Sequence, residues 1–285
     1  MRSLLKALDS LGELKQLDRI VGPLQKAVRA VPLGPYRAVL QGRPIGHPLH
    51  PVLVQVPIGS WSSAAVLDLL PGGGRPARLL VGLGVVSAVP AAWAGWVDWA
   101  EQPERQLRTG VVHAAANGAA IALYAGSWAV RGRGRPVLGR LLGFAGLTVA
   151  GVGGMIGGHL AFRQAVGSNK TEPVDHLVEP GWHSVGRAAE FSQGQAARRM
   201  LGDVALLVVK EPDGFHVLVD RCSHMAGPLS EGKIADGCVA CPWHGSVFRL
   251  ADGENVGGPA TAPQPVFETR LTEDGVLEVR LPEAV

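Results

Sequence analysis

The fold is decided by Cys222-Ser-His-Met-Ala-Gly-Pro-Leu229 and Cys241-Pro-Trp-His-Gly-Ser-Val-Phe248, two short stretches of a 285-residue chain. In each stretch a histidine follows a cysteine two or three residues later. Two thiolates and two imidazoles on two loops can bind a [2Fe–2S] cluster, with sulfur on one iron and nitrogen on the other, or a tetrahedral zinc ion. The spacing leaves both open, because Cys238 adds a thiol three residues before the second stretch, as in many zinc sites.

Short β-rich runs lie around both loops, separated by Pro-Asp-Gly, Asp-Gly and Glu-Asp-Gly turns. The runs are Ala205–Val209, Phe215–Asp220, Gly237–Pro242, Ser246–Leu250, Val266–Leu271 and Leu277–Leu281. Short strands joined by glycine turns are typical of a small antiparallel β domain. We therefore predict an all-β domain over residues 182–285.

Both loops resemble the cluster-binding loops of Rieske proteins, and Gly258–Pro265 resembles the proline loop that covers the cluster in that family. The resemblance spans residues 180–283 and implies a [2Fe–2S] cofactor. The metal ligands that it implies are Cys222 and Cys241 on one iron and His224 and His244 on the other. Cys238 has no counterpart among these ligands, so we expect it in the strand before the second loop.

The resemblance is closest to the ferredoxin-like members of the family. Respiratory Rieske proteins join their loops by a disulfide, whereas Gly227 and Trp243 stand at the matching positions here, which suits a reducing compartment. Ser246 matches a serine that donates a hydrogen bond to the cluster in high-potential members, but Phe248 replaces a tyrosine. Because such bonds raise the reduction potential, we expect Ser246 to tune the cluster to a potential between the two extremes.

The C-terminal region offers little room for catalysis of its own. Only 41 residues follow His244, which is too few for the catalytic domain of a Rieske oxygenase, and the chain has no nucleotide-binding fingerprint. We therefore expect no catalytic residues. The chain is predicted to be an electron-transfer component of an oxidoreductase system rather than a stand-alone catalyst.

Charge and hydropathy divide the chain into two halves. Residues 1–165 contain 17 Lys and Arg against 7 Asp and Glu, hence +10, whereas residues 166–285 contain 10 against 17, hence −7. The mean hydropathy of +0.18 averages an apolar half and a polar half. A basic, apolar half suits a membrane, and an acidic half argues against nucleic-acid binding.

Four apolar stretches in the first half are each close to the ~20 residues that cross a bilayer. They are Pro51–Leu70, Leu79–Ala100, Gly110–Val130 and Leu141–Phe162, joined by short connections rich in glycine, proline and arginine. We predict four transmembrane helices, with a buried soluble bundle as the alternative. Small residues at every fourth position, from Ala114 to Gly126 and from Gly146 to Gly158, predict that the last two helices pack along these strips.

The N-terminal region is amphipathic. Leucine and valine recur at three- and four-residue steps over residues 3–31, with Lys and Arg on the other face. We expect a helix that breaks near Gly22-Pro23 and lies on the lipid surface or binds a partner. No apolar core with a cleavage site follows the charged start, so we expect no signal peptide.

With four spans, all four histidines of this half lie at one membrane face, together with one carboxylate. They are His47 and His50 before the first span, Asp98 at the end of the second, His113 at the start of the third and His159 at the end of the fourth. Ionisable groups at membrane depth are costly and are candidates for function. Imidazole serves haem, quinone or a metal ion, so this face could bind haem b or quinone, or its polar residues could simply cap helices.

A second resemblance concerns this half. His47-Pro-Leu-His50-Pro and Gly95-Trp-Val-Asp98-Trp99 are similar to a bacterial four-span membrane domain of unknown function, over residues 44–165. The predicted division is an amphipathic interfacial region at 1–45, a four-helix transmembrane domain at 46–165, a linker at 166–181 and the Rieske-type domain at 182–285.

Sidedness does not follow from basic residues, because six lie near the spans at each face. A folded cluster domain needs a twin-arginine signal for export, and the one Arg pair, Arg198-Arg199, lies in the β domain. We therefore expect a multi-pass protein of the cell membrane with its cluster domain on the cytoplasmic face.

Together these features predict a multi-domain protein, an N-terminal all-α transmembrane bundle plus a C-terminal all-β iron-sulfur domain. The predicted function is a membrane-anchored one-electron carrier, linked to haem or quinone in the membrane domain. One alternative is a ferredoxin-like domain merely tethered to the membrane that supplies a separate oxidoreductase, and another is a non-redox structural zinc module. The expected partners are the lipid bilayer and a redox partner protein or quinone, and the sequence does not indicate an oligomeric state.

Overall fold

The structure is a computed structural model that describes residues 2–282. The chain forms two compact units, one made of Met1–Gly42 and Pro48–Gly167 and the other of Arg43–His47 and Ser168–Val285. The first unit is helical and the second is built from β-sheet.

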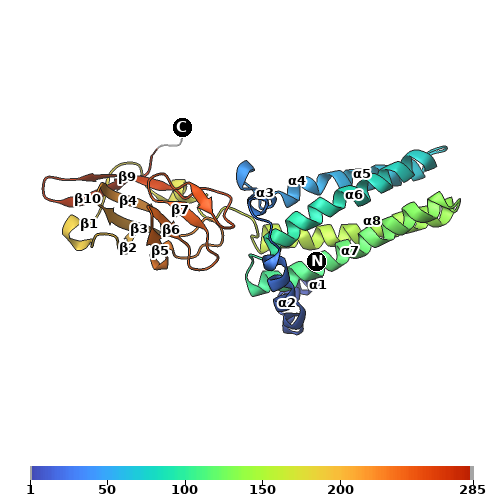
Figure 1. Ribbon diagram of the computed structural model, residues 1–285, viewed down its shortest axis with the longest axis horizontal. Coiled ribbons are helices and arrows are strands. Elements are labelled where there is room, and N and C mark those ends of the chain that lie inside the picture. Colours follow the sequence, from blue (N-terminus) through green and yellow to red (C-terminus); the bar gives the residue numbers. More distant parts are fainter. Residues whose placement is uncertain (1, 283–285) are drawn as a thin grey trace. The chain divides into compact units, whose positions relative to one another are not determined.

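Four helices lie side by side in the helical unit (Figure 1). They are α5 (Gln55–Asp68), preceded by the single turn α4 (His50–Leu53), α6 (Gly74–Trp99), α7 (Glu104–Gly132) and α8 (Pro136–Gly158), which continues into the π-turn η3 (His159–Arg163). Each coincides with a predicted apolar stretch. Proline at the start of α8 and just before α7 suits these helix starts, because a first-turn residue needs no intrahelical donor.

The structure does not confirm the prediction that four helices span the membrane. Among the described residues, Gly74–Trp99 and Pro136–Arg163 are long and apolar enough to cross a bilayer. Helix α5 has only 14 residues, and α7 carries Glu104, Arg105 and Arg108 in its first turns. The structure therefore bears out four helices but gives two candidate spans.

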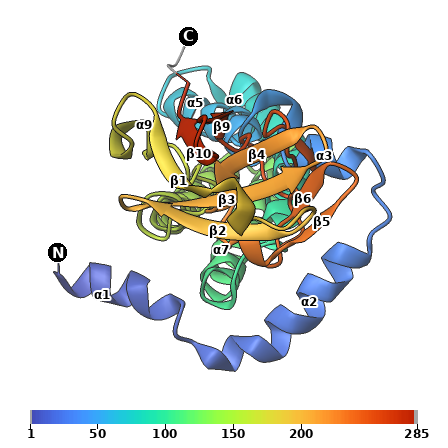
Figure 2. The same ribbon diagram turned by 90° about the vertical axis from the view of Figure 1, so that its left-hand side faces the viewer.

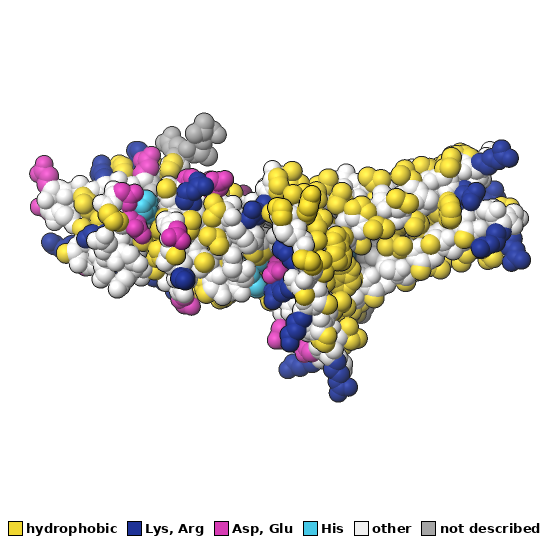
Figure 3. All heavy atoms as spheres, in the orientation of Figure 1, with side chains coloured by type: hydrophobic (Ala, Val, Ile, Leu, Met, Phe, Trp, Pro, Cys, Tyr) yellow, Lys and Arg dark blue, Asp and Glu magenta, His cyan; other side chains and the backbone are white. Residues whose placement is uncertain are grey.

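Large apolar side chains are nonetheless exposed along the bundle. They include Val56, Ile58 and Val66 on α5, Leu79, Leu83, Val86 and Val89 on α6, and Leu141, Val152 and Met155 on α8. Figure 3 shows hydrophobic side chains over these helices, with Lys and Arg gathered at the end that holds the α5–α6 and α7–α8 connections. A continuous apolar surface of this kind is unusual in water and is typical of contact with lipid.

Helices α7 and α8 pack closely, as predicted, but only partly along the predicted strips. Gly118, Ala122 and Gly154 are exposed. Gly146 of the predicted strip is buried, whereas the other buried glycines of α8, Gly139, Gly143 and Gly153, lie outside the strip. A Cβ at Gly146 would lie 3.0 Å from the Tyr124 ring, and one at Gly153 would lie 2.7 Å from the Asn117 amide. Large side chains of α7 thus fill grooves above glycine, and they determine which face is buried.

The N-terminal segment forms α1 (Arg2–Leu11), η1 (Lys15–Leu17) and α2 (Asp18–Ala30), followed by α3 (Tyr36–Leu40) and η2 (Arg43–Ile45). The predicted break at Gly22-Pro23 is wrong, because Pro23 lies inside α2 and the chain bends between α1 and η1 (Figure 2). Pro23 is the sixth residue of α2, so its missing N–H removes one intrahelical hydrogen bond without ending the helix.

Ion pairs hold both helices on the bundle. Arg163 donates to both oxygens of Asp9 at 2.7 Å, and Arg108 donates to both oxygens of Asp18 at 2.6 and 2.8 Å. Val21 and Val28 pack with Trp99, Ala100 and Leu107 in a buried cluster.

The β unit begins with the single helical turn α9 (Val174–Leu177) and contains two antiparallel sheets. The larger has the order β1-β10-β9-β4-β3-β2, from β1 (His183–Arg187), β2 (Ala196–Leu201), β3 (Val204–Glu211), β4 (Gly214–Val219), β9 (Val266–Leu271) and β10 (Val276–Arg280). The smaller has the order β5-β6-β7-β8, from β5 (Lys233–Ala235), β6 (Cys238–Ala240), β7 (Val247–Arg249) and β8 (Asn255–Gly257).

All six predicted β-rich runs are strands, and β1, β2, β5 and β8 were not predicted. The hairpin from β5 to β6 turns at Asp236 and Gly237, whose φ angles of 53° and 69° are those of a two-residue turn that matches strand twist. A buried cluster that includes Leu207, Leu218, Val239 and Phe248 packs beneath the smaller sheet and contains two cysteines, Cys222 and Cys241.

Candidate metal centre

Two loops carry the predicted cluster ligands. The first loop, residues 222–227, lies between β4 and β5, and the second loop, residues 241–246, joins β6 to β7. Each is closed by the same pair of backbone hydrogen bonds. Ala226 N–H donates to Cys222 O at 2.8 Å and Cys222 N–H donates to Gly227 O at 2.9 Å. In the second loop Gly245 N–H donates to Cys241 O at 3.1 Å and Cys241 N–H donates to Ser246 O at 2.8 Å.

The two cysteine thiols face each other. Cys222 is 1% exposed and Cys241 is 4% exposed, and a hydrogen bond joins their sulfurs. That bond lowers the pKa of Cys241 to about 6, helped by the backbone N–H groups of Trp243 and His244. The same bond, together with burial, raises the pKa of Cys222. The second loop therefore stabilises a thiolate, which is the form of cysteine that binds metal.

The two imidazoles form a second pair. The rings of His224 and His244 are 5.2 Å apart, centre to centre, with their planes at 88°. Burial, the neighbouring His244 and the charge of Lys170 lower the pKa of His224 to about 3. His224 is thus neutral at any physiological pH, as a metal-ligating imidazole must be.

This donor set fits a two-iron cluster better than a single ion. Among residues 2–282, no three His, Cys, Asp or Glu side chains gather where one metal ion could bind. Sulfur is paired with sulfur and imidazole with imidazole, which is the division of ligands between the irons of a Rieske cluster. A Cβ at Gly227 would lie 2.8 Å from the Cys241 sulfur, so glycine leaves that sulfur free space.

Trp243 stands where the resemblance placed a disulfide cysteine. Its indole would lie 3.0 Å from a Cβ at Gly227, so the ring packs directly on the backbone of the first loop. Contact between an indole and a glycine therefore joins the two loops at the point where respiratory members have a disulfide.

The segment Gly258–Pro265, the proline loop, covers the first loop. Gln264 is 2% exposed, and its amide makes three hydrogen bonds. Its Oε1 accepts from Ser223 N–H at 3.1 Å, and its Nε2 donates to Val219 O at 2.6 Å and Arg221 O at 2.7 Å. The Ser223 hydroxyl donates to Ala262 O at 2.9 Å. The proline loop thus holds the first loop through side chains.

Ser246 lies in the second loop and is fully buried. Its Oγ accepts a hydrogen bond from Ala260 N–H at 3.1 Å. That bond uses the oxygen as acceptor and leaves the hydroxyl hydrogen available inside the protein. Phe248, also fully buried, packs in the core beneath the smaller sheet and offers no hydroxyl.

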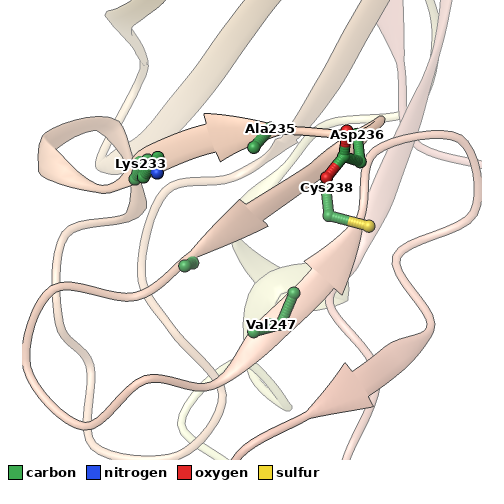
Figure 4. A pocket seen from close by; sticks show the side chains of 6 residues that line it. Lys233, Ala235, Asp236, Cys238 and Val247 are labelled. Carbon is green, nitrogen blue, oxygen red and sulfur yellow. The ribbon is translucent and has the colours of Figure 1, made fainter.

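Cys238 lies on β6, which confirms its predicted place in the strand before the second loop. Its side chain points into a shallow, open hollow lined by Lys233, Ala235, Asp236 and Val247 (Figure 4). Cys238 is the first residue of β6 and pairs with Ala235 across the hairpin. The second loop begins after the last residue of this strand, so β6 lies between Cys238 and the loop.

Two residues near the first loop were missed by sequence reasoning. Gln264 holds the loop through three bonds, and the signal that could have found it is its place between Pro263 and Pro265. Lys170, in the predicted linker, donates its backbone N–H to Ser223 O at 2.9 Å and places its charge near His224. No pattern in the sequence links Lys170 to the loop.

The helical unit brings together part of the predicted histidine cluster. The rings of His50 and His113 are 6.2 Å apart, centre to centre. Asp98 lies on the face of α6 that carries Gly95, against which His50 packs. His159 is instead buried with its Nε2 3.6 Å from Asp9, and His47 belongs to the other compact unit.

Helix α7 makes further buried polar and aromatic contacts toward its C-terminal end. Tyr124 stacks on Trp61, with ring centres 4.2 Å apart. Further along, Arg131 donates to both oxygens of Asp68 at 2.7 and 2.5 Å, and both side chains are 3% exposed. Asp68 is therefore the buried partner of Arg131 at the opposite end of the bundle from His113.

Two family models match the chain. Residues 181–268 match the model described as Rieske [2Fe-2S] domain, and residues 46–170 match the model described as predicted membrane protein (DUF2231). One match lies largely in each compact unit, and the two support the two resemblances found in the sequence.

Curated relatives match the C-terminal third of the chain. The anthranilate 1,2-dioxygenase ferredoxin subunit of Burkholderia cepacia is 35% identical over 100 residues, which are 35% of this chain and 92% of that protein. Ferredoxin CarAc of Metapseudomonas resinovorans is 32% identical over 96 residues, 33% of this chain and 90% of that protein. Among solved structures, a chain of the complex of reduced oxygenase and oxidized ferredoxin in carbazole 1,9a-dioxygenase is similar, with 30% identity, a TM-score of 0.34, and coverage of 36% of this chain and 96% of that chain.

Proposed function

The chain belongs to the Rieske [2Fe–2S] family, with a Rieske domain joined to a DUF2231 predicted membrane protein domain, and we propose that it is a membrane-anchored one-electron carrier. The homologous ferredoxins are the electron-transfer components named above. This function agrees with the β unit, in which backbone hydrogen bonds close both loops that carry the predicted ligands.

The observation that carries the proposal is the two-by-two pairing of donors. We assign Cys222 and Cys241 to one iron and His224 and His244 to the other, because the thiols share a hydrogen bond and the imidazoles are neighbours. When bound, the cluster supplies reversible transfer of one electron. The chain's own residues hold the loops closed, keep His224 neutral and exclude water from both sulfurs.

Low-temperature EPR of the purified, dithionite-reduced full chain tests this assignment. We expect a Rieske-type signal and two irons per chain in the wild type. Cys241→Ser should abolish the signal, because it removes a thiolate ligand, whereas Cys238→Ser should keep it, because Cys238 lies on β6 away from the loops. Zinc in place of iron, with no EPR signal, would show a structural zinc module instead.

We propose a protein oxidoreductase as the redox partner. The similar proteins are named as the ferredoxin subunit of a dioxygenase and as a ferredoxin, and this supports electron exchange with an oxygenase component. The alternative, a tethered ferredoxin-like domain that serves a separate enzyme, differs only in whether the membrane unit takes part.

For the membrane unit we propose four spans, a region at 1–45 that lies in the interface and a linker at 166–181. Helices α4 and α5 together cover His50–Asp68, close to the ~20 residues of a span, and exposed apolar side chains on α5 support contact with lipid. The charges at the start of α7 lie at the same end as α1 and α2, where an aqueous boundary suits them.

Reporter fusions after Gly72, Gln102 and Gly134 separate four spans from two. Four spans with a cytoplasmic Rieske domain predict that alkaline phosphatase is active after Gly72 and Gly134, and green fluorescent protein fluoresces after Gln102. If α6 and α8 alone span, the fusions after Gly72 and Gly134 must report opposite sides.

A redox group in the membrane unit completes the proposal. The candidate groups are haem b and quinone, and the candidate residues that lie close together within this unit are His50 and His113, with Asp98 on the neighbouring face of α6. Support comes from the proximity of His50 and His113 inside the bundle, which places two ionisable rings where they are costly without a function.

A further inference from the structure

Two imidazole rings lie close together inside the helical unit, and each has its Nδ1 atom against a backbone carbonyl oxygen. The Nδ1 atom of His50 lies 2.8 Å from Ala91 O on α6, and the Nδ1 atom of His113 lies 2.8 Å from Gly153 O on α8. A carbonyl oxygen only accepts hydrogen bonds, so each Nδ1 carries the proton. Each neutral ring therefore keeps its lone pair on Nε2, the tautomer in which histidine binds a metal.

Both rings are held in place by glycine backbones. A Cβ at Gly95 would lie 2.9 Å from the Nδ1 of His50, and a Cβ at Gly157 would lie 2.9 Å from the Cε1 of His113. Any larger residue at either position would displace the ring. Four helical segments thus fix this pair: α4 and α7 supply the imidazoles, and α6 and α8 supply the glycines and the carbonyl acceptors.

Asn117 does not use the lone pair of His113. Its amide nitrogen donates to the backbone oxygen of His113 at 2.9 Å, and lies 3.3 and 3.4 Å from the two ring nitrogens. Nearly equal distances to Nδ1 and Nε2 place the amide over the ring, away from the in-plane lone pair of Nε2.

The separation of the rings selects the kind of ligand. A metal–imidazole bond is about 2.0 Å and the nitrogen lies about 1.1 Å from the ring centre, so two imidazoles on opposite sides of one ion have centres about 6 Å apart. The centres of His50 and His113 are 6.2 Å apart. A hydroquinone that donated one hydroxyl to each ring would hold the centres roughly 10 Å or more apart.

The same pair lacks the further ligands that a bare ion needs. No three His, Cys, Asp or Glu side chains converge on one point anywhere in the described part of the chain. A porphyrin supplies four nitrogens of its own and leaves two axial positions for histidine. We propose that His50 and His113 are the two axial ligands of a haem iron in the helical unit. The inference rests on the proposed redox function, whose Rieske cluster lies in the other unit and has a separate spectrum.

Optical and EPR spectra of the full chain, purified in detergent from cells supplied with haem precursor, test the inference. We expect a Soret band, about one haem per chain by pyridine haemochrome, and a low-spin ferric signal. Because the imidazole planes stand at 86°, that signal should be strongly anisotropic, since perpendicular ligands leave two iron d orbitals nearly equal in energy.

Variants identify the ligands. His113→Ala and His50→Ala should each lose the low-spin signal and most of the haem, while the Rieske EPR signal persists. His159→Ala is the matched control, because His159 lies at the same end of the bundle but pairs with Asp9, and it should keep the haem. If a ligand variant fails to fold, the wild-type spectra still decide.

A Rieske signal without a Soret band overturns the haem inference and leaves the proposed carrier function intact. Quinone in the lipid extract without haem, or iron beyond two atoms per chain without a Soret band, overturns it in the same way. A Soret band without the Rieske signal instead contradicts the proposed function. High-spin haem that survives both ligand variants shows binding elsewhere and also refutes the assignment.

Discussion

The first and second loops of the candidate metal centre have the same backbone plan but are held by different means. In both loops the backbone N–H and C=O of the cysteine make the hydrogen bonds that close the loop. The fourth residue after the cysteine has a positive φ angle, 63° at Ala226 and 71° at Gly245. The second loop uses glycine for this left-handed conformation, whereas the first forces an alanine into it, at a cost of about 1 kcal/mol.

The serine side chains of the two loops differ in whether they donate a hydrogen bond to the proline loop or accept one from it. In the first loop the hydroxyl of Ser223 donates to the proline loop, and Gln264 completes three further bonds around the same segment. In the second loop Ser246 accepts from the proline loop and keeps its own hydrogen to donate. The first loop is thus stabilised by its cover, and the second retains a donor for the cluster. Three kinds of substitution separate these two roles. They are the loss of Gln264, a change at either left-handed residue and the loss of either serine hydroxyl.

The largest effect is expected for Gln264→Leu. The substitution leaves Ser223 N–H and the carbonyls of Val219 and Arg221 buried without partners, and each such group costs about 1–3 kcal/mol. The temperature at which the visible cluster spectrum is lost should fall by on the order of 10 °C. Gln195→Leu, the same change at an exposed site, should shift it little. Equal shifts in the two variants would show that the cover does not stabilise the first loop.

A reciprocal pair of substitutions tests the shared backbone plan. Ala226→Gly should stabilise the domain by about 1 kcal/mol, because glycine adopts a positive φ without steric cost. Gly245→Ala should destabilise it by a similar amount, about 1 kcal/mol, through conformation alone, since a Cβ there meets no atom within 4 Å. Denaturant titration followed by cluster absorbance measures both. Effects of the same sign in the two variants would contradict the conformational explanation.

The strands and the ligand loops could be predicted from the sequence because local chemistry determines them. Turn residues such as Asp236-Gly237 mark hairpins, and the cysteine and histidine motif is contiguous in each loop. The three-residue strands β5 and β8 escaped prediction because their pairing depends on neighbours rather than on a pattern of their own. Break points were harder too, since Pro23 fits within α2 and the bend comes earlier.

Contacts between distant segments could not be predicted. Gln264 reaches residues more than forty positions away, and nothing in the motif gives the direction of its amide. The histidines show the same limit. The order of the four predicted spans placed His50, His113 and His159 at one end of the bundle, but helix rotation decides that the first two face each other and that His159 faces Asp9. The small-residue strips were right only at Gly146 for the same reason, because Asn117 and Tyr124 determine the buried face of α7.

The smallest effect concerns the reduction potential and compares the two serines directly. Ser246→Ala should lower the midpoint potential by about 50–100 mV, the equivalent of one hydrogen bond to a charged group, because a donor to the reduced cluster is lost. Ser223→Ala removes a hydroxyl from the other loop, where it donates to Ala262 O and not to the cluster. Its potential should therefore stay close to that of the wild type, although its thermal stability falls.

Redox titration of both variants, monitored by EPR on the full chain, gives the comparison. An unchanged midpoint in Ser246→Ala would mean that its hydroxyl hydrogen points elsewhere, and the second loop would then be held by Ala260 in the way that the first is held by Ala262. Equal decreases in both variants would instead trace the change to loosened loops, because Ser223 donates its hydroxyl hydrogen to Ala262 O and not to the cluster.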